Sequence, residues 1–239
     1  MSLSLIESYK ECRDLFRKHS KSYYLGSMIF PFQKFKYITA FYGLVRLIDD
    51  AVDKDSSLNK QDKLLRLNNA FFELYDNKDR SNVMWFVYPK IYQAVFDMID
   101  NLDLSRDIFE RFFSSMKMDL VKTEYQNFDE LVRYMDGSAM IVGEVMIKIM
   151  TFENTNFYHN RNLNLYIPHA RSLAVSFQLT NFIRDISEDL SMDPSRIYLP
   201  KNEQKIYNLE LKYYTNNTLI DDNFIAFIKF QIIKNRLYY

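Results

Sequence analysis

Glycine, proline and cysteine are all scarce in this chain of 239 residues. Four Gly and five Pro are too few to supply the many tight turns of an all-β or α/β fold. The lone Cys12 excludes an intrachain disulfide framework and a cysteine-rich metal site. These shortages favour a helical protein and fit a reducing cytoplasm, which is the compartment we expect.

A net charge and a long apolar run are also missing. The 31 Lys and Arg balance the 31 Asp and Glu, so there is no basic footprint for a general nucleic-acid partner, and none is expected. No stretch of about 18 apolar residues is present, so no membrane-spanning helix is expected. Residues 1–12 lack the basic start and apolar core of a signal peptide.

Apolar residues make up 48% of the chain, enough for one sizeable core or at most two small ones. They recur at helical spacing, without the alternation typical of strands. We therefore predict an all-α fold. The predicted helices cover residues 5–18, 31–53, 58–75, 84–100 (bent or begun at Pro89), 104–125, 128–150, 163–190 and 223–239.

Four polar residues share one face of the predicted helix 163–190: Gln178, Asn181, Asp185 and Asp189. Their spacing of three, four and four residues places them on successive turns. A row of buried amides and carboxylates is unfavourable unless a cation neutralises it. Oxygen ligands on adjacent turns suit Mg²⁺ better than Zn²⁺, with Mn²⁺ as an alternative. The helix is expected to be largely buried by its apolar residues Leu173, Phe177, Phe182 and Ile186.

A second acidic group lies in the stretch RLIDDAVD, residues 46–53. Asp49 and Asp53 are one helical turn apart, and Arg46 lies one turn before Asp49. Acidic clusters also occur on plain solvated surfaces, which is the alternative interpretation. We expect the two acidic faces to meet across one cavity that holds a metal-bridged pyrophosphate.

Two further patterns leave alternatives open. His19, Ser20, Lys21 and Ser22 are either a solvated helix end with capping serines or a set of donors for phosphate oxygens. Gly137 and Gly143 lie inside the predicted helix 128–150, where each glycine costs about 1 kcal/mol relative to alanine. They indicate either close helix packing or a bend that leaves room beside a ligand.

Five motifs, the last of them followed by RIYLP, together resemble the squalene/phytoene synthase family, and the resemblance covers residues 19–239. The motifs are HSKSYYLG at His19, YGLVRLIDDAVD at Tyr42, KMDLVKTEY at Lys117, YMDGSAMIVGEV at Tyr134, QLTNFIRDISED at Gln178 and RIYLP at Arg196. The resemblance implies a single isoprenoid synthase domain over residues 1–239, built as a helical bundle with a central cavity. Family members usually continue for one or two helices beyond the position of Tyr239, which leaves a fragment or a reduced form as alternatives.

The resemblance also implies roles for individual residues. Tyr134 and Asp119 match polar residues near the site, while Met140 and Ala174 depart from the small residue and the glycine usual in the family. Arg196 and Tyr198 match the arginine and aromatic of a closing loop. The implied Mg²⁺ ligands are Asp49, Asp53, Asn181, Asp185 and Asp189; the implied pyrophosphate-binding residues are His19, Ser20, Lys21, Ser22, Tyr42, Arg46, Gln178 and Arg184.

The implied activity joins two prenyl diphosphates head to head. The TNFIRD and RIYLP wording is most like that of phytoene synthases, which join two geranylgeranyl diphosphates to form phytoene, a carotenoid precursor. No glycine-rich dinucleotide fingerprint is present, so NADPH is not expected. The alternatives are a squalene or dehydrosqualene synthase using farnesyl diphosphate, a class I terpene cyclase, and a non-catalytic relative such as a respiratory-complex assembly factor. A lipid product also raises the expectation of peripheral membrane association.

The motifs leave the length of the prenyl chain open. Tyr23 follows HSKS directly, and Gly26 and Ser27 lie about one helical turn further along. Small residues there leave room that Phe or Leu would fill, and each buried methylene is worth ~0.8 kcal/mol. We therefore expect the C20 substrate to be favoured over C15. Met140 would narrow the cavity from the opposite wall and so act against this preference.

Overall fold

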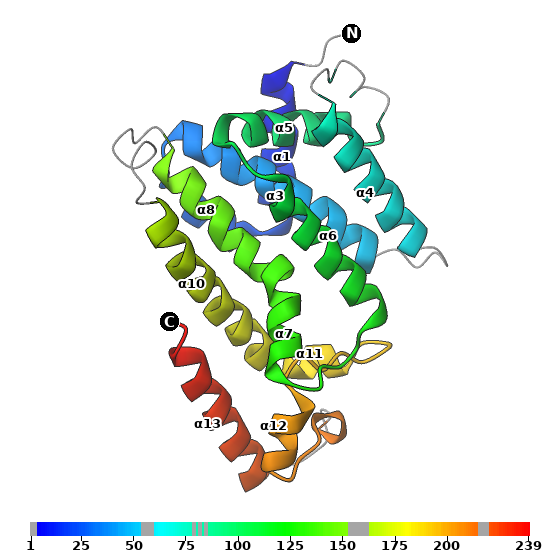
Figure 1. Cartoon of the computed structure of the whole chain (residues 1–239), viewed down its shortest axis with the longest axis vertical. Helices are drawn as coiled ribbons and strands as arrows, with labels where there is room; N and C mark the ends of the chain where they lie inside the picture. The colour runs from blue at the N-terminus through cyan, green and yellow to red at the C-terminus, as the bar shows by residue number, and fades with distance from the viewer. Residues whose placement is uncertain are drawn as a thin grey trace. The chain divides into compact units, whose positions relative to one another are not determined.

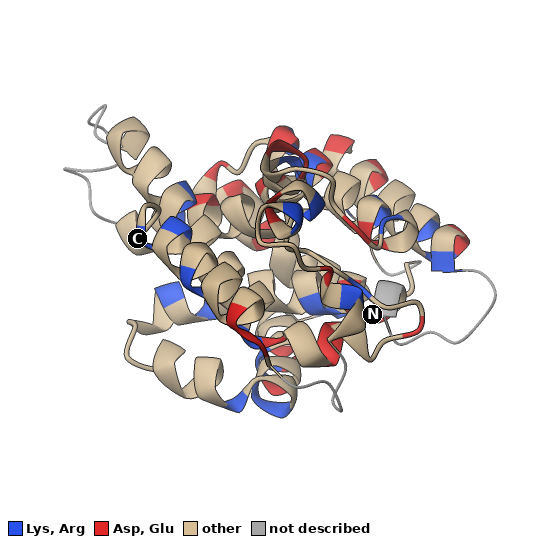
Figure 2. Cartoon of the chain, turned by 90° about the horizontal axis from the view of Figure 1, so that it is seen from below, with Lys and Arg blue, Asp and Glu red and all other residues tan. Residues whose placement is uncertain are grey.

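The structure, a computed structural model, describes residues 4–53, 60–77, 80, 83, 86–152, 163–214 and 220–239. The described chain is helical, which confirms the predicted all-α class (Figure 1). Outside the helices, its β-pairing is one isolated parallel bridge between Glu124 and Ile197. None of the described helices is long and apolar enough to cross a bilayer. Lys, Arg, Asp and Glu are interspersed over the helices (Figure 2).

Contacts divide the chain into two compact units, each described here by itself. Unit 1 comprises residues 1–109 and 145–163, and unit 2 comprises residues 110–144 and 164–239. The boundaries fall inside α6 (Arg106–Val121), α8 (Ile141–Thr151) and α10 (Leu163–Arg184).

Unit 1 contains α1 (Leu5–His19), α2 (Lys21–Ser27), α3 (Phe32–Asp53), α4 (Lys60–Asp76) and α5 (Pro89–Leu102). Helices α1, α3 and α5 pack against one another, and α4 packs against α3. Aromatic rings fill the space between them, with the Phe71 ring 5.1 Å from that of Phe96 and 4.8 Å from that of Phe109. As the sequence predicts, Pro89 lies at the first position of its helix, where its missing N–H costs nothing.

Unit 2 contains α7 (Phe128–Met135), the π-helical turn η2 (Asp136–Met140), α11 (Ile186–Leu190), α12 (Lys201–Ile206), the 3₁₀ turn η3 (Leu211–Tyr213) and α13 (Asp222–Arg236). Its core includes Tyr134 of α7, Leu179 and Phe182 of α10, and Phe227 of α13. Helix α13 starts where the Asp221 carboxylate accepts a hydrogen bond from the Phe224 N–H, an N-cap within two residues of the predicted start.

Both interpretations of the two glycines in the predicted helix 128–150 apply: the helices pack closely, and the segment is bent. Gly137 lies in η2, which interrupts the helix, and a Cβ at that position would come 1.9 Å from the Arg111 carbonyl oxygen. A Cβ at Gly143 would come 2.4 Å from the Ala170 carbonyl oxygen. Glycine is therefore needed because the backbones of α6 and α10 approach this segment closely, and the π-turn supplies the bend.

A group of ion pairs holds the same segment in unit 2. The Arg111 guanidinium donates to both carboxylate oxygens of Glu144, at 2.9 and 2.7 Å, and Arg171 pairs with Glu144 and with Asp136. Burial raises the pKa of Glu144, but the hydrogen bonds from Arg111 and Arg171 outweigh it and hold that pKa below its ordinary value. The pairs tie α6, η2, α8 and α10 together around the two glycines.

Three details differ from the predictions. The predicted helix 163–190 is broken at Asp185, where α10 ends and α11 begins. Leu173 and Phe177 are 39% and 56% exposed, so this helix is less buried than expected. The predicted helix 104–125 ends at Val121 because Ile197 and Lys201 donate backbone hydrogen bonds to Thr123 and Tyr125, which draws that segment into an extended form.

Candidate functional site

An extended segment at residues 195–200 positions two of the predicted site residues in unit 2. The Ile197 N–H donates to the Thr123 carbonyl at 2.7 Å, and the Lys201 N–H donates to the Tyr125 carbonyl at 2.9 Å. Because side chains alternate along extended backbone, Arg196 and Tyr198 lie on the same side of the segment. The Arg196 N–H donates to the Asp189 carbonyl at 2.9 Å, which fastens this segment to the end of α11.

Aromatic rings gather beside Tyr198. Its ring stacks on Phe182 with centroids 4.3 Å apart and planes 12° apart. The Tyr134 ring lies 5.7 Å from Tyr198 and 5.5 Å from Tyr125. Such pairs are worth ~0.5–1.5 kcal/mol each beyond the area they bury. The sequence analysis did not assign Tyr125 or Phe182 to the site, although Tyr125 lies in the motif KMDLVKTEY.

Tyr134 and Asp119 form a polar pair beside these rings. The Tyr134 hydroxyl donates to the Asp119 carboxylate at 2.8 Å. Complete burial, followed by the charge of Asp119, raises the pKa of Tyr134 well above its ordinary value. The Tyr134 hydroxyl is therefore held in its protonated form, in which it donates the hydrogen bond to Asp119.

The Asp189 carboxyl group is strongly perturbed by its surroundings. Burial, and next the charge of Asp185, raise its pKa to about 6, with smaller contributions from Glu188 and then Asp119; Arg196 acts in the opposite direction. A divalent cation bound beside Asp189 would offset the repulsion that this carboxylate experiences from its acidic neighbours.

Asp185 is neutralised differently. Arg184 pairs with it through two hydrogen bonds, each 2.6 Å long, and these lower the pKa of Asp185. The helical turns on either side of the break at Asp185 are intact. The Asp185 N–H donates to the Asn181 carbonyl and the Asp189 N–H donates to the Asp185 carbonyl, both at 2.9 Å. The oxygen side chains of Asn181, Asp185 and Asp189 thus remain on successive turns.

The kind of donor in this set fits a hard cation such as Mg²⁺. In the part of the chain that the structure describes, however, no three His, Cys, Asp or Glu side chains converge as a ready-made metal site. Asp185 is instead engaged by Arg184, so a cation would have to displace this pair or add ligands from outside the protein.

In unit 1 the structure places the other predicted residues near the end of α3. Arg46 pairs with Asp50 at 2.6 Å, an interaction that the sequence analysis missed. Burial raises the pKa of Tyr42, and Asp49 adds to this, while Arg46 and a hydrogen bond with the Ser20 side chain act against it. The Tyr42 ring stacks on Phe16 with centroids 4.1 Å apart.

The segment HSKS joins α1 to α2. His19 ends α1, and Lys21 and Ser22 are exposed in the first turn of α2. Ser20 makes no side-chain capping hydrogen bond and bonds to Tyr42 instead, which disfavours the simple capping interpretation. The side chain of Asp53 lies outside the described residues. Asp49 and Asp185 belong to different units, so their meeting across one cavity stays a prediction.

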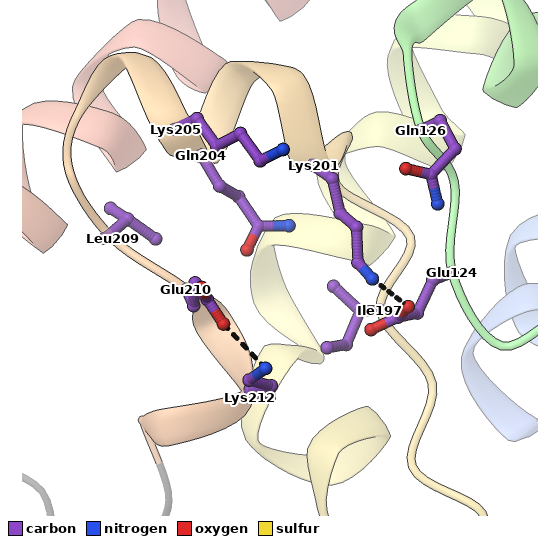
Figure 3. Close-up of a pocket in the computed structure, with 9 residues that line it drawn as sticks. All are labelled: Glu124, Gln126, Ile197, Lys201, Gln204, Lys205, Leu209, Glu210 and Lys212. Atoms are coloured by element: carbon purple, nitrogen blue, oxygen red, sulfur yellow. Dashed lines mark ion pairs between the residues drawn. The ribbon is translucent and has the colours of Figure 1, made fainter.

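A pocket of about 260 Å³ lies elsewhere in unit 2 (Figure 3). Lys201 pairs with Glu124 across it, and Lys212 pairs with Glu210 at 2.7 Å. The residues that line it include none of the predicted site residues, and nothing in the sequence pattern indicates it. We assign it no part in the site. Its lining is Glu124, Gln126, Ile197, Lys201, Gln204, Lys205, Leu209, Glu210 and Lys212.

The raised pKa of Asp189 predicts a pH dependence of stability in the metal-free protein. Its folded pKa of about 6 exceeds its ordinary 3.8, so the folded state holds the extra proton between these values and loses stability as the pH rises. Asp189→Asn should remove this loss, worth about 1 kcal/mol once solvent screening is allowed for. Urea unfolding of both proteins between about pH 4 and pH 7 measures it. Parallel stability curves would contradict the prediction.

Comparisons with known proteins identify the family of this chain. The squalene/phytoene synthase family matches it over residues 16–239. A 15-cis-phytoene synthase from Synechococcus elongatus is 29% identical over 239 residues, which cover 99% of this chain and 74% of that protein. A chloroplastic phytoene synthase from Daucus carota is also 29% identical, over 98% of this chain, which spans 56% of the carrot protein.

Solved structures agree on the fold. A dehydrosqualene synthase in complex with ligand superposes with a TM-score of 0.81 at 21% identity, over 98% of this chain and 75% of that one. The squalene synthase HpnC from Alicyclobacillus acidocaldarius gives a TM-score of 0.80 at 17% identity, over 100% of this chain and 82% of that one. With the match over residues 16–239, these findings show that the chain belongs to the squalene/phytoene synthase family.

Proposed function

We propose that this chain is a prenyltransferase that condenses two geranylgeranyl diphosphates head to head to give phytoene and diphosphate, in carotenoid biosynthesis. The family match over residues 16–239 carries the proposal, together with relatives that are themselves phytoene synthases. The chain also keeps both acidic motifs, one around Asp49 and one around Asp185. A non-catalytic relative would have no need of them.

The charged residues would act on the diphosphate leaving groups. The carboxylates of Asp49, Asp53, Asp185 and Asp189, with the Asn181 amide, would hold Mg²⁺, which supplies Lewis-acid stabilisation of the departing diphosphate. His19, Ser20, Lys21, Ser22, Arg46, Gln178, Arg184 and Arg196 would bind diphosphate oxygens directly. Such groups accelerate ionisation because they are already in place when the negative charge develops.

The aromatic residues would protect the reactive carbon. Loss of diphosphate from the first substrate leaves an allylic cation, which the double bond of the second substrate attacks; loss of a proton closes a cyclopropane ring. Loss of the second diphosphate, rearrangement and proton loss then give the conjugated triene. Rings such as Tyr134, Tyr198, Phe182 and Tyr42 exclude water and can stabilise a cation by ~0.5–2 kcal/mol each.

Substrate length is assigned to α2. The Ser27 hydroxyl donates to the Tyr23 carbonyl at 2.8 Å, and a Cβ at the exposed Gly26 would have no atom within 4 Å. We expect Ser27→Phe to shift preference from geranylgeranyl towards farnesyl diphosphate by at least about tenfold in kcat/KM, since a filled floor excludes the methylenes of the extra isoprene unit. Competition between the two substrates measures the shift, and Ser27→Thr is the control. An unchanged ratio would contradict the assignment.

The proposal is tested by the product. The protein is incubated with Mg²⁺ and geranylgeranyl diphosphate, or with farnesyl diphosphate, and the extracted hydrocarbon is identified. Phytoene is expected. Squalene or dehydrosqualene from farnesyl diphosphate alone would favour the C30 alternative, a C20 hydrocarbon would favour a terpene cyclase, and no product from either substrate would favour a non-catalytic relative. Activity without NADPH and, at reduced rate, with Mn²⁺ is expected.

A further inference from the structure

Large apolar side chains stand exposed along the end of α2 and the turn that follows it. Leu25 is 65% exposed, Met28 57%, Ile29 82% and Phe32 74%. Helix α2 contains no buried residue. Four large apolar residues exposed within eight positions differ from single apolar residues scattered over a surface, and such patches mark interaction sites.

The packed side of α2 is identified by Tyr24. Its ring lies 5.6 Å from Phe16 of α1 and 5.7 Å from Phe35 of α3, both in edge-to-face geometry. This contact packs α2 against α1 and α3 of unit 1. The exposed side chains therefore belong to a segment that is fixed in place by Tyr24.

The charge around this segment has one sign. From Leu15 to Ile48 the chain contains six Lys and Arg and no Asp or Glu. Arg17 and Lys18 end α1, directly before α2, and both are exposed. No acidic side chain among the described residues pairs with either of them. The nearest preceding acid, Asp14, lies one turn before Lys18 and pairs with Arg13. Exposed apolar residues beside cations that have no acidic partner are the composition of a segment that lies in an anionic membrane interface.

We propose that Leu25, Met28, Ile29 and Phe32 form a docking surface for an anionic lipid bilayer, with Arg17 and Lys18 contacting lipid headgroups. The inference rests on the proposed function in one respect: substrate and product with C20 and C40 chains partition into membranes, and α2 is the helix to which substrate length is assigned. Docking at this surface holds that helix at the bilayer.

Co-sedimentation with vesicles tests the surface without substrate or turnover. The full chain should bind vesicles of phosphatidylcholine mixed with phosphatidylglycerol more tightly than vesicles of phosphatidylcholine alone. Ile29→Ser combined with Phe32→Ser should weaken binding to the mixed vesicles at least about tenfold. Arg17→Gln combined with Lys18→Gln should weaken it by roughly 25-fold and reduce the preference for the anionic lipid, because each cation contributes about fivefold, ~1 kcal/mol.

A matched control removes apolar residues that are equally exposed but lie elsewhere. Val87 is 81% exposed and Ile206 is 70% exposed, and Val87→Ser combined with Ile206→Ser should leave binding unchanged. Circular dichroism confirms that each variant is folded. Absence of wild-type binding to mixed vesicles, or equal binding by the Ile29 and Phe32 variant, would overturn the proposal. Concentration-dependent dimerisation that the same variant abolishes, without vesicle binding, would instead assign the surface to a second copy of the chain. Hydrocarbon formation in detergent solution is measured separately, so the proposed function can fail without affecting this result.

Discussion

Asp185→Asn is expected to lower turnover of prenyl diphosphate by at least about a thousandfold while leaving the protein folded. The substitution keeps the shape of the side chain but removes a charged oxygen that the metal and diphosphate would need. The loss of its pair with Arg184 should cost little stability, since the Arg184 side chain is 64% exposed and exposed pairs contribute only ~0–1 kcal/mol. Steady-state rates of diphosphate release at saturating Mg²⁺ measure the effect.

Glu188→Gln is the matched control, because it removes a carboxylate three residues away on α11 that is exposed and has no assigned role. Its turnover should stay within about threefold of the wild type. Similar losses in Asp185→Asn and Glu188→Gln would show that general charge, not a specific ligand, is involved. Near-normal turnover in Asp185→Asn would remove the assigned role of this residue.

Gly137→Ala is expected to destabilise the fold by about 3 kcal/mol or more, the largest stability effect we expect of a single added methyl group. The new Cβ would come 1.9 Å from the Arg111 carbonyl oxygen, 2.3 Å from the Ser115 hydroxyl oxygen and 2.5 Å from the Arg111 carbonyl carbon. Backbone atoms cannot move aside cheaply, so α6 and η2 must separate. Urea unfolding of the full chain measures the free energy of unfolding.

Gly26→Ala in α2 is the control for the same change of residue. A Cβ there meets no atom within 4 Å, so the substitution should be neutral or should stabilise by up to ~1 kcal/mol through helix propensity. If Gly137→Ala unfolded at the same urea concentration as the wild type, the close approach of α6 to η2 would be wrong.

The helices could be predicted from sequence because their signals are local. Pro89 and the apolar periodicity of α5 each act within one or two turns. The end of α6 could not be predicted in this way. Residues 122–125 read as a continuation of a helix, but they are extended because Ile197 and Lys201, more than 70 positions away, donate hydrogen bonds to them.

The candidate site, too, was predictable where the signal is local and not elsewhere. The spacing of Asn181, Asp185 and Asp189 indicated oxygen side chains on successive turns, and the structure keeps them there. The Arg184–Asp185 pair joins neighbours in sequence, yet helical spacing alone gives no sign of it, because adjacent residues point in different directions on a regular helix. The break at Asp185 makes the pair geometrically available.

The stacking partners of Tyr198 show a second limit. Phe182 was assigned to the apolar side of its helix, and the structure places its ring on Tyr198, which comes from the extended segment 195–200. Tyr125 joins the same group because the bridge between Glu124 and Ile197 aligns the two segments. Contacts between segments that are distant in the chain produce no periodic pattern in the sequence of either segment. They can therefore be recognised only in the folded structure.

The most direct test of the central claim is the ratio of diphosphate released to hydrocarbon formed from geranylgeranyl diphosphate and Mg²⁺. Head-to-head condensation predicts two diphosphates for each C40 hydrocarbon, with no diphosphate left on the product. A ratio of one with a C20 hydrocarbon would indicate a terpene cyclase, and a ratio of one with a C40 prenyl diphosphate would indicate head-to-tail chain extension. Either result, or no Mg²⁺-dependent release of diphosphate, would contradict the proposed function.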